Sequence, residues 1–177
     1  MTATSPVLAR AVLAAADHTA HRPTGAAFDV VLILHVVCAV VGLGTVVVSA
    51  VQAGRFRTVA SGQLPSGVRS YFAPGVNWAG RALYGVPVFG FVLVGMSDGF
   101  FDVGDGWILW GLVLWVAAIW AAEALLWPAE RRVKAVLADR PDGPWPEAAR
   151  DCRTVVWLGS GLTAVLILAV VLMVVQP

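Results

Sequence analysis

The sequence VVLILHVVCAVVGLGTVVVSAVQAG, residues 30–54, contains no charged side chain. A bilayer core about 30 Å thick requires about 20 apolar residues in a helix that rises about 1.5 Å per residue. This run meets that length, and Arg55 and Arg57 end it. It therefore predicts one membrane-spanning helix, over about residues 29–53.

Three more apolar runs follow, and they predict spans over about residues 78–97, 107–128 and 154–175. Hydrophobic residues make up 59% of the chain and charged residues 13%, against about 45–50% and about 25% in soluble domains. We therefore expect an all-α protein, an up-and-down bundle of four transmembrane helices over residues 28–177. Pro87 lies inside the second span, so a neighbouring helix has to satisfy the carbonyl that this proline leaves free.

Residues 1–27 form a more polar N-terminal tail. Ser5 and Pro6 are a good helix start, so the apolar residues that follow could form a short helix on the membrane surface. Asp17, His18 and His21 resemble a metal-binding cluster, but side chains in such a tail are more often solvated. The tail therefore carries no site that we predict.

Basic residues are distributed unevenly between the two sides of the predicted bundle. Ten of the 12 lie in or beside the loops after the first and third spans, and the loop after the second span has three Asp and no base. The positive-inside rule then puts both long loops in the cytoplasm and both termini on the outer side. Eleven Arg against one Lys is typical of a GC-rich bacterial genome, so we expect a bacterial cytoplasmic (inner) membrane.

His35 is the only histidine inside a predicted span. Ionisable groups at membrane depth are candidates for function. One interpretation is a ligand for haem b or copper, with Met96 completing a His/Met pair or Cys38, Met96 and Met173 acting as soft ligands. The other interpretation is a neutral imidazole that bonds to a neighbouring helix. The second interpretation is favoured, because no other histidine lies within the spans. We therefore predict no cofactor outright.

Arg81 and Glu123 are a second candidate pair, at the start of the second span and near the end of the third. A carboxylate at this depth costs less when it is paired, so we expect a structural ion pair between them. A proton-relay role for Glu123 would need further titratable groups across the membrane. Apart from His35, the spans offer only Tyr84.

With these residues in view, the chain resembles a bacterial family of predicted four-span integral membrane proteins of unknown function. The likeness rests on LILHVVCAVVGLGTVV at residues 32–47, EALLWPAERR at residues 123–132 and LMVVQP at residues 172–177. The first helix is also similar to copper-resistance D-type membrane domains. That second likeness implies a ligand at His35, although the other intramembrane histidines of those domains are missing here.

The functional prediction follows from what the sequence holds and what it lacks. It has no phosphate-cradling loop, no nucleophile elbow, no CxxC and no HExxH motif. A net charge of +1 without a basic, aromatic-rich cluster argues against nucleic acid as a partner. We therefore expect a non-catalytic component of a membrane complex or homo-oligomer, with lipid and other membrane subunits as partners. The alternative is a haem- or copper-binding protein centred on His35.

Overall fold

The computed structural model describes residues 23–59, 64–75, 77–140 and 143–175, in which all regular secondary structure is helical. The expected N-terminal helix and the Asp17, His18 and His21 cluster lie outside these residues. Four helical segments are long and apolar enough to cross a membrane: Ala26–Thr58, Trp78–Gly95, Gly106–Asp139 and Pro146–Val175. The prediction of an all-α, four-span bundle is confirmed.

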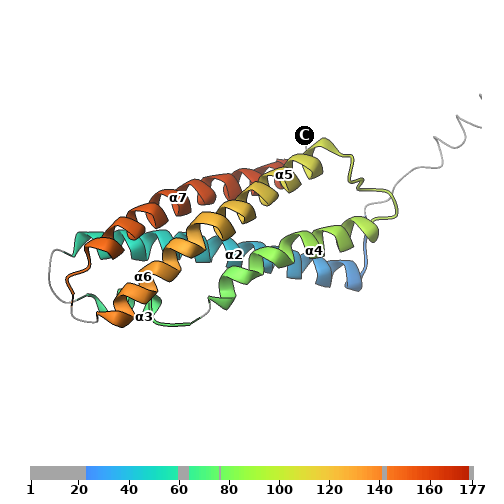
Figure 1. The fold of residues 1–177 in the computed structure, drawn as a ribbon. Coiled ribbons are helices and arrows are strands. Elements are labelled where there is room, and N and C mark those ends of the chain that lie inside the picture. Colours follow the sequence, from blue (N-terminus) through green and yellow to red (C-terminus); the bar gives the residue numbers. More distant parts are fainter. Residues whose placement is uncertain (1–22, 60–63, 76, 141–142, 176–177) are drawn as a thin grey trace, which may run out of the picture.

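The first and last spans are single helices, α2 (Ala26–Thr58) and α7 (Pro146–Val175). The second span begins as a 3₁₀ turn, η1 (Trp78–Arg81), and continues as α4 (Ala82–Gly95). The third consists of α5 (Gly106–Ala121), a π-helical turn η2 (Ala122–Leu126) and α6 (Trp127–Asp139). A short helix, α3 (Ser66–Tyr71), lies in the first long loop. Successive spans run in opposite directions (Figure 1).

The spans form an open arc in the order α4, α2, α7, α5. Helix α2 packs against both α4 and α7, and α5 packs against α7. Figure 1 accordingly shows α4 beside α2 and α5 beside α7. Among the other spans, α4 has extensive contact with α2 alone, so α4 forms one end of the arc.

Several helices are longer than the predicted spans. Helix α2 has 33 residues, about 50 Å at the rise of an α-helix, which exceeds a bilayer core of about 30 Å. Helix α7 starts at Pro146, in a stretch that the sequence indicated as a polar loop. Proline suits the first helical position because its missing N–H would have no partner there.

The excess length of these helices builds a compact region that we call the cap. It consists of the end of α2, residues 64–72 with α3, α6, and the start of α7, whose side chains pack together. Its core is formed by Phe56, Leu64, Val68, Phe72, Val133, Ala148 and Cys152. Burial of apolar groups is driven by water, whereas lipid tails exert no such drive between helices. The best-buried side chains therefore gather where the helices leave the bilayer.

Candidate functional site

His35 connects α2 to α4. Its Nδ1 lies 2.8 Å from the carbonyl oxygen of Val86. A carbonyl can only accept a hydrogen bond, so Nδ1 must donate the proton. The neutral ring then keeps Nε2 unprotonated, and this atom remains able to accept a hydrogen bond or to bind a metal.

Two glycines of α4 allow α2 to approach. A Cβ atom built on Gly85 would lie 2.5 Å from Cys38 Sγ, and one on Gly90 would lie 3.3 Å from His35 Cε1. His35 and Cys38 therefore share the face of α2 that packs on α4. Met96 follows Gly90 by about 9 Å along the axis of α4, so the structure does not bring Met96 beside His35.

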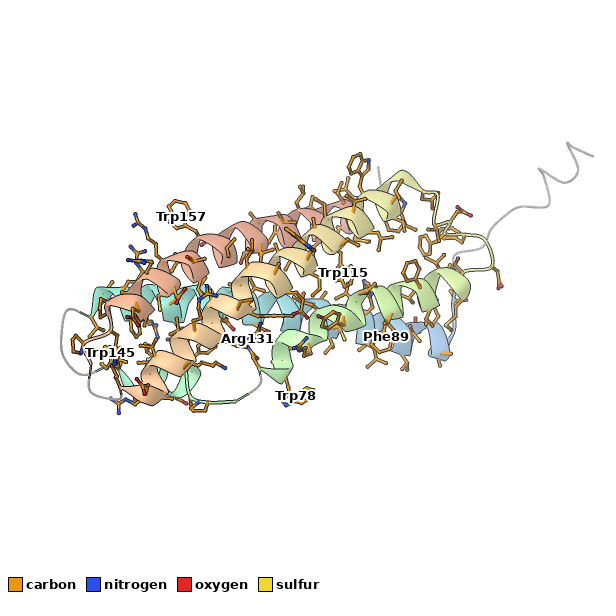
Figure 2. The ribbon with its side chains drawn as sticks, in the orientation of Figure 1. Trp78, Phe89, Trp115, Arg131, Trp145 and Trp157 are labelled. Carbon is orange, nitrogen blue, oxygen red and sulfur yellow. The ribbon has the colours of Figure 1, made fainter. Side chains whose placement is uncertain are left out.

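Pro87 lies within α4 and has no N–H to offer the carbonyl of Leu83, four residues earlier. Trp115 of α5 supplies the missing donor, with Nε1 at 2.9 Å from Leu83 O. Figure 2 shows Trp115 reaching from α5 toward α4. The carbonyl freed by proline is thus satisfied by a neighbouring helix, as the sequence requires.

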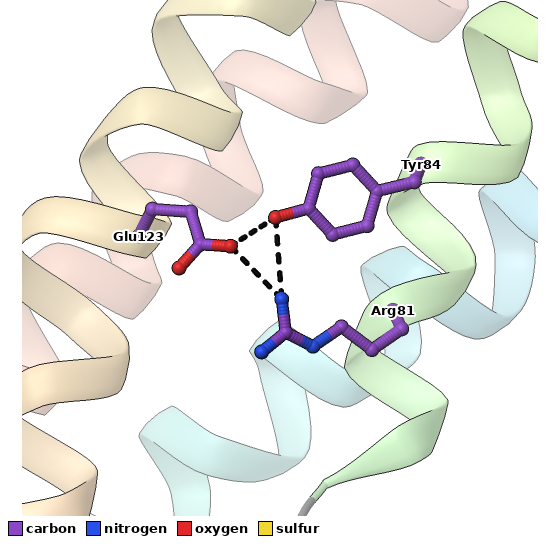
Figure 3. A network of polar contacts seen from close by, with 3 residues as sticks. All are labelled: Arg81, Tyr84 and Glu123. Atoms are coloured by element: carbon purple, nitrogen blue, oxygen red, sulfur yellow. Dashed lines mark hydrogen bonds and ion pairs between the residues drawn. The ribbon is translucent and has the colours of Figure 1, made fainter.

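Arg81, Tyr84 and Glu123 form a network between the start of the second span and η2 (Figure 3). Arg81 Nη1 lies 2.9 Å from Glu123 Oε1, and the Tyr84 hydroxyl donates to the same oxygen. The guanidinium also lies over the Trp127 ring, 4.8 Å from its centroid. The structure therefore brings Arg81 and Glu123 into direct contact, with both side chains about two-fifths exposed.

A buried carboxylate, Glu130 of α6, was not among the residues predicted from the sequence. Glu130 is 4% exposed, and it accepts hydrogen bonds from the hydroxyls of Ser49 and Tyr71. Burial and the neighbouring Glu130 carboxylate raise the pKa of Tyr71 well above its usual range, so this phenol stays protonated, as a donor, into the alkaline range. Three elements, α2, α3 and α6, therefore meet at one side chain.

Sequence spacing held a signal for this site. Glu130 follows Leu126 by four residues and precedes Val133 by three, so it lies on the apolar face of α6. The basic residues that follow, Arg131, Arg132 and Lys134, mask this apolar face in the sequence. Only an amphipathic analysis of residues 126–139 would have placed this carboxylate in the core.

Glu130 borders a very small cavity of about 10 Å³, whose lining includes Thr45, Ser49 and Asn77. That volume is at the lower limit for one water molecule. Thr45, Ser49 and Gln52 continue the face of α2 that carries His35 and Cys38, because they follow at helical spacing. The Gln52 side-chain oxygen is buried and has no hydrogen-bond partner among the described residues.

The part of the chain that the structure describes contains no group of three or more His, Cys, Asp or Glu able to hold a metal ion. Both cysteines are free thiols. Most of the polar groups described above join one helix to another. This chemistry ties the bundle together and leaves His35 Nε2 as an available donor atom for a ligand.

Comparison with known proteins identifies a family. The model of a family described as "Predicted integral membrane protein (DUF2269)" matches residues 29–177. No curated protein and no solved structure matches the chain significantly. The matched region begins just before the residues on which the predicted resemblance rests, and it covers all four spans apart from the first three residues of α2.

Proposed function

Since the chain belongs to the DUF2269 family of predicted integral membrane proteins, we propose that it is a non-catalytic component of a membrane assembly. In this role the bundle presents α4 to another membrane subunit or to a second copy of the chain. The observation that carries the proposal is the position of α4 at the end of the open arc, in extensive contact with α2 alone among the other spans.

The far face of α4 supports this role. Val88, Phe91 and Val92 are 58%, 50% and 42% exposed. The hydrogen bonds from α4 to the third span are made through the side chains of Trp115 and Glu123. An apolar helix can face either lipid or a protein partner. Because these residues lie away from the contact with α2, a partner could pack on this face without breaking an existing helix interface.

The polar groups within the spans also favour a structural role. His35, Trp115 and Glu123 each bond to an element of the second span, and Glu130 is engaged by Ser49 and Tyr71. Hydrogen bonds of this kind between membrane helices stabilise a bundle by about 0.6–2 kcal/mol each. A protein that keeps its polar groups in such bonds is suited to packing and not to turnover of a substrate.

The same proposal places the protein in a bacterial inner membrane, with the two basic loops in the cytoplasm. Membrane-impermeant thiol reagents test the orientation in intact cells. A cysteine at Asp102, in the acidic loop, should be labelled from outside, whereas one at Arg140 should require permeabilised cells. The reverse pattern would invert the topology.

Site-specific photocrosslinking in native membranes tests the packing role. A photoreactive residue at Phe91 should yield a covalent protein adduct, whose mass distinguishes a homo-oligomer from a complex with another subunit. The matched control is Leu168 on α7, which is 49% exposed and should crosslink to lipid only. Lipid adducts alone at both positions would contradict the proposal.

A second candidate function is haem or copper binding at His35, favoured by the free Nε2. Ligand histidines commonly donate their other ring N–H to a carbonyl, as His35 does to Val86. A further ligand would have to come from outside the His35 and Cys38 face, because Met96 lies too far along α4. Gently purified protein should then show a Soret band or near-stoichiometric copper, and His35→Gln should abolish either one. A colourless, metal-free protein purified from cells supplied with haem and copper would refute this function.

A further inference from the structure

A groove opens between the start of α7 and the junction of η2 with α6. It has a volume of about 520 Å³ and is lined by Ala124, Leu125, Arg132, Arg153, Thr154, Trp157 and Leu158. This volume lies within the range of about 300–1,000 Å³ that is usual for small-molecule sites. None of these residues takes part in the networks around His35, Glu123 or Glu130.

The groove is divided into a basic end and an apolar end. Arg132 and Arg153 line one part, while Leu125, Trp157 and Leu158 line the other. Arg153 forms no ion pair within the described residues, whereas Arg132 is paired with Asp151 at 2.9 Å. The unpaired guanidinium of Arg153 and the hydroxyl of Thr154 offer donors for an anion.

The groove lies at the expected level of the lipid headgroups. The uncharged run of α7 begins at Thr154, directly after Arg153, so this end of the groove marks the edge of the apolar span. Trp157 is 72% exposed and stands away from the bundle in Figure 2. Tryptophan prefers the membrane–water interface, and basic pockets between transmembrane helices suit anionic headgroups.

We propose that this groove binds one anionic phospholipid. Its phosphate lies at Arg153 and Thr154, and the part of its acyl chain nearest the headgroup lies along Leu125, Trp157 and Leu158. Charge complementarity selects an anionic headgroup, and the apolar half of the groove requires the attached chain. The site is independent of any partner at α4, so the two proposals can fail separately.

Native mass spectrometry of the full chain, released from bilayers of mixed phosphatidylglycerol and phosphatidylcholine, tests the site. The wild-type protein should retain about one phosphatidylglycerol in preference to phosphatidylcholine. Arg153→Gln should weaken this retention about fivefold, the effect expected for one Arg at a membrane surface. Trp157→Leu should shorten the residence of the lipid.

Two matched controls accompany these variants. Arg150→Gln removes an exposed charge one turn earlier on α7, and Trp120→Leu removes a tryptophan that is 67% exposed outside the groove. Both should retain lipid as the wild type does. An equal loss in Arg150→Gln and Arg153→Gln would reduce the effect to general surface charge and overturn the proposal.

Inorganic phosphate distinguishes a lipid site from a phosphate site. Millimolar phosphate should leave the bound phosphatidylglycerol in place, because it gains nothing from the apolar half of the groove. Displacement of the lipid by phosphate alone would overturn the proposal. Since Arg153 and Trp157 are exposed, their variants should keep the melting temperature of the wild type, which checks that the fold is intact.

Discussion

The hydroxyl of Tyr71 in α3 lies 3.2 Å from a carboxylate oxygen of Glu130 in α6 and donates a hydrogen bond to it. This bond joins the first long loop to the third span across 59 residues of sequence. Ser49 of α2 donates to the same oxygen. The buried carboxylate thus joins α3 of the first long loop to α2 and α6.

Glu130→Ala should lower the free energy of unfolding by about 2–3 kcal/mol, because the buried hydroxyl of Ser49 and the half-buried hydroxyl of Tyr71 lose their acceptor. Glu130→Gln keeps an acceptor oxygen and should cost less. Equilibrium unfolding in mixed micelles measures both. Glu147→Ala, at an exposed glutamate of α7, is the control and should change stability by no more than about 0.5 kcal/mol. Equal effects at positions 130 and 147 would contradict the anchoring role.

Stability should fall at alkaline pH through Tyr71. Burial, together with the Glu130 charge, raises the pKa of Tyr71 in the folded protein. The stability that the protonated Tyr71 contributes is therefore fully present at pH values below the pKa of about 10 that a tyrosine has in the unfolded chain. As pH rises above about 10, the unfolded state loses this proton first, and stability should drop by up to about 1.4 kcal/mol per pH unit. Tyr71→Phe should remove that part of the slope. Unfolding curves between pH 9 and 11 that have the same slope for both proteins would argue against it.

The bond from Trp115 to Leu83 O should matter only because Pro87 is present. Trp115→Phe should cost about 1–3 kcal/mol by leaving a buried carbonyl without a donor. Pro87→Ala restores an N–H for that carbonyl, so the cost of Trp115→Phe should shrink in this background. A double-mutant cycle measures the coupling. Additive effects would show that the two residues stabilise α4 independently, and Trp120→Phe serves as the exposed control.

Gly85→Ala should loosen the contact between α2 and α4, because the new Cβ would lie 2.5 Å from Cys38 Sγ. We expect a loss of about 1–3 kcal/mol from overpacking, with partial recovery when Cys38→Ala removes the sulfur. Gly95→Ala meets no atom within 4 Å and should be neutral or slightly stabilising. Thermal denaturation in detergent ranks the three variants, and a Gly85→Ala protein as stable as Gly95→Ala would disprove the close approach.

Local composition was sufficient for the spans and for part of their chemistry. The apolar runs around His35, Trp115 and Leu162 each exceed the length that a bilayer demands, and this requirement acts on each segment by itself. The need for a donor to Leu83 O followed from Pro87 in the same way, since a proline removes an N–H wherever the helix packs.

Tertiary structure alone decided which faces meet. A valine that faces lipid and a valine that faces another helix look the same in sequence, because lipid tails are as apolar as the side chains of a helix interface. The arc order of the spans, the pairing of His35 with Val86 O and the donor Trp115 therefore required the fold. Glu130 is hidden for a related reason: a carboxylate can be buried only where partners from distant segments reach it, and Ser49 and Tyr71 come together only in the folded chain.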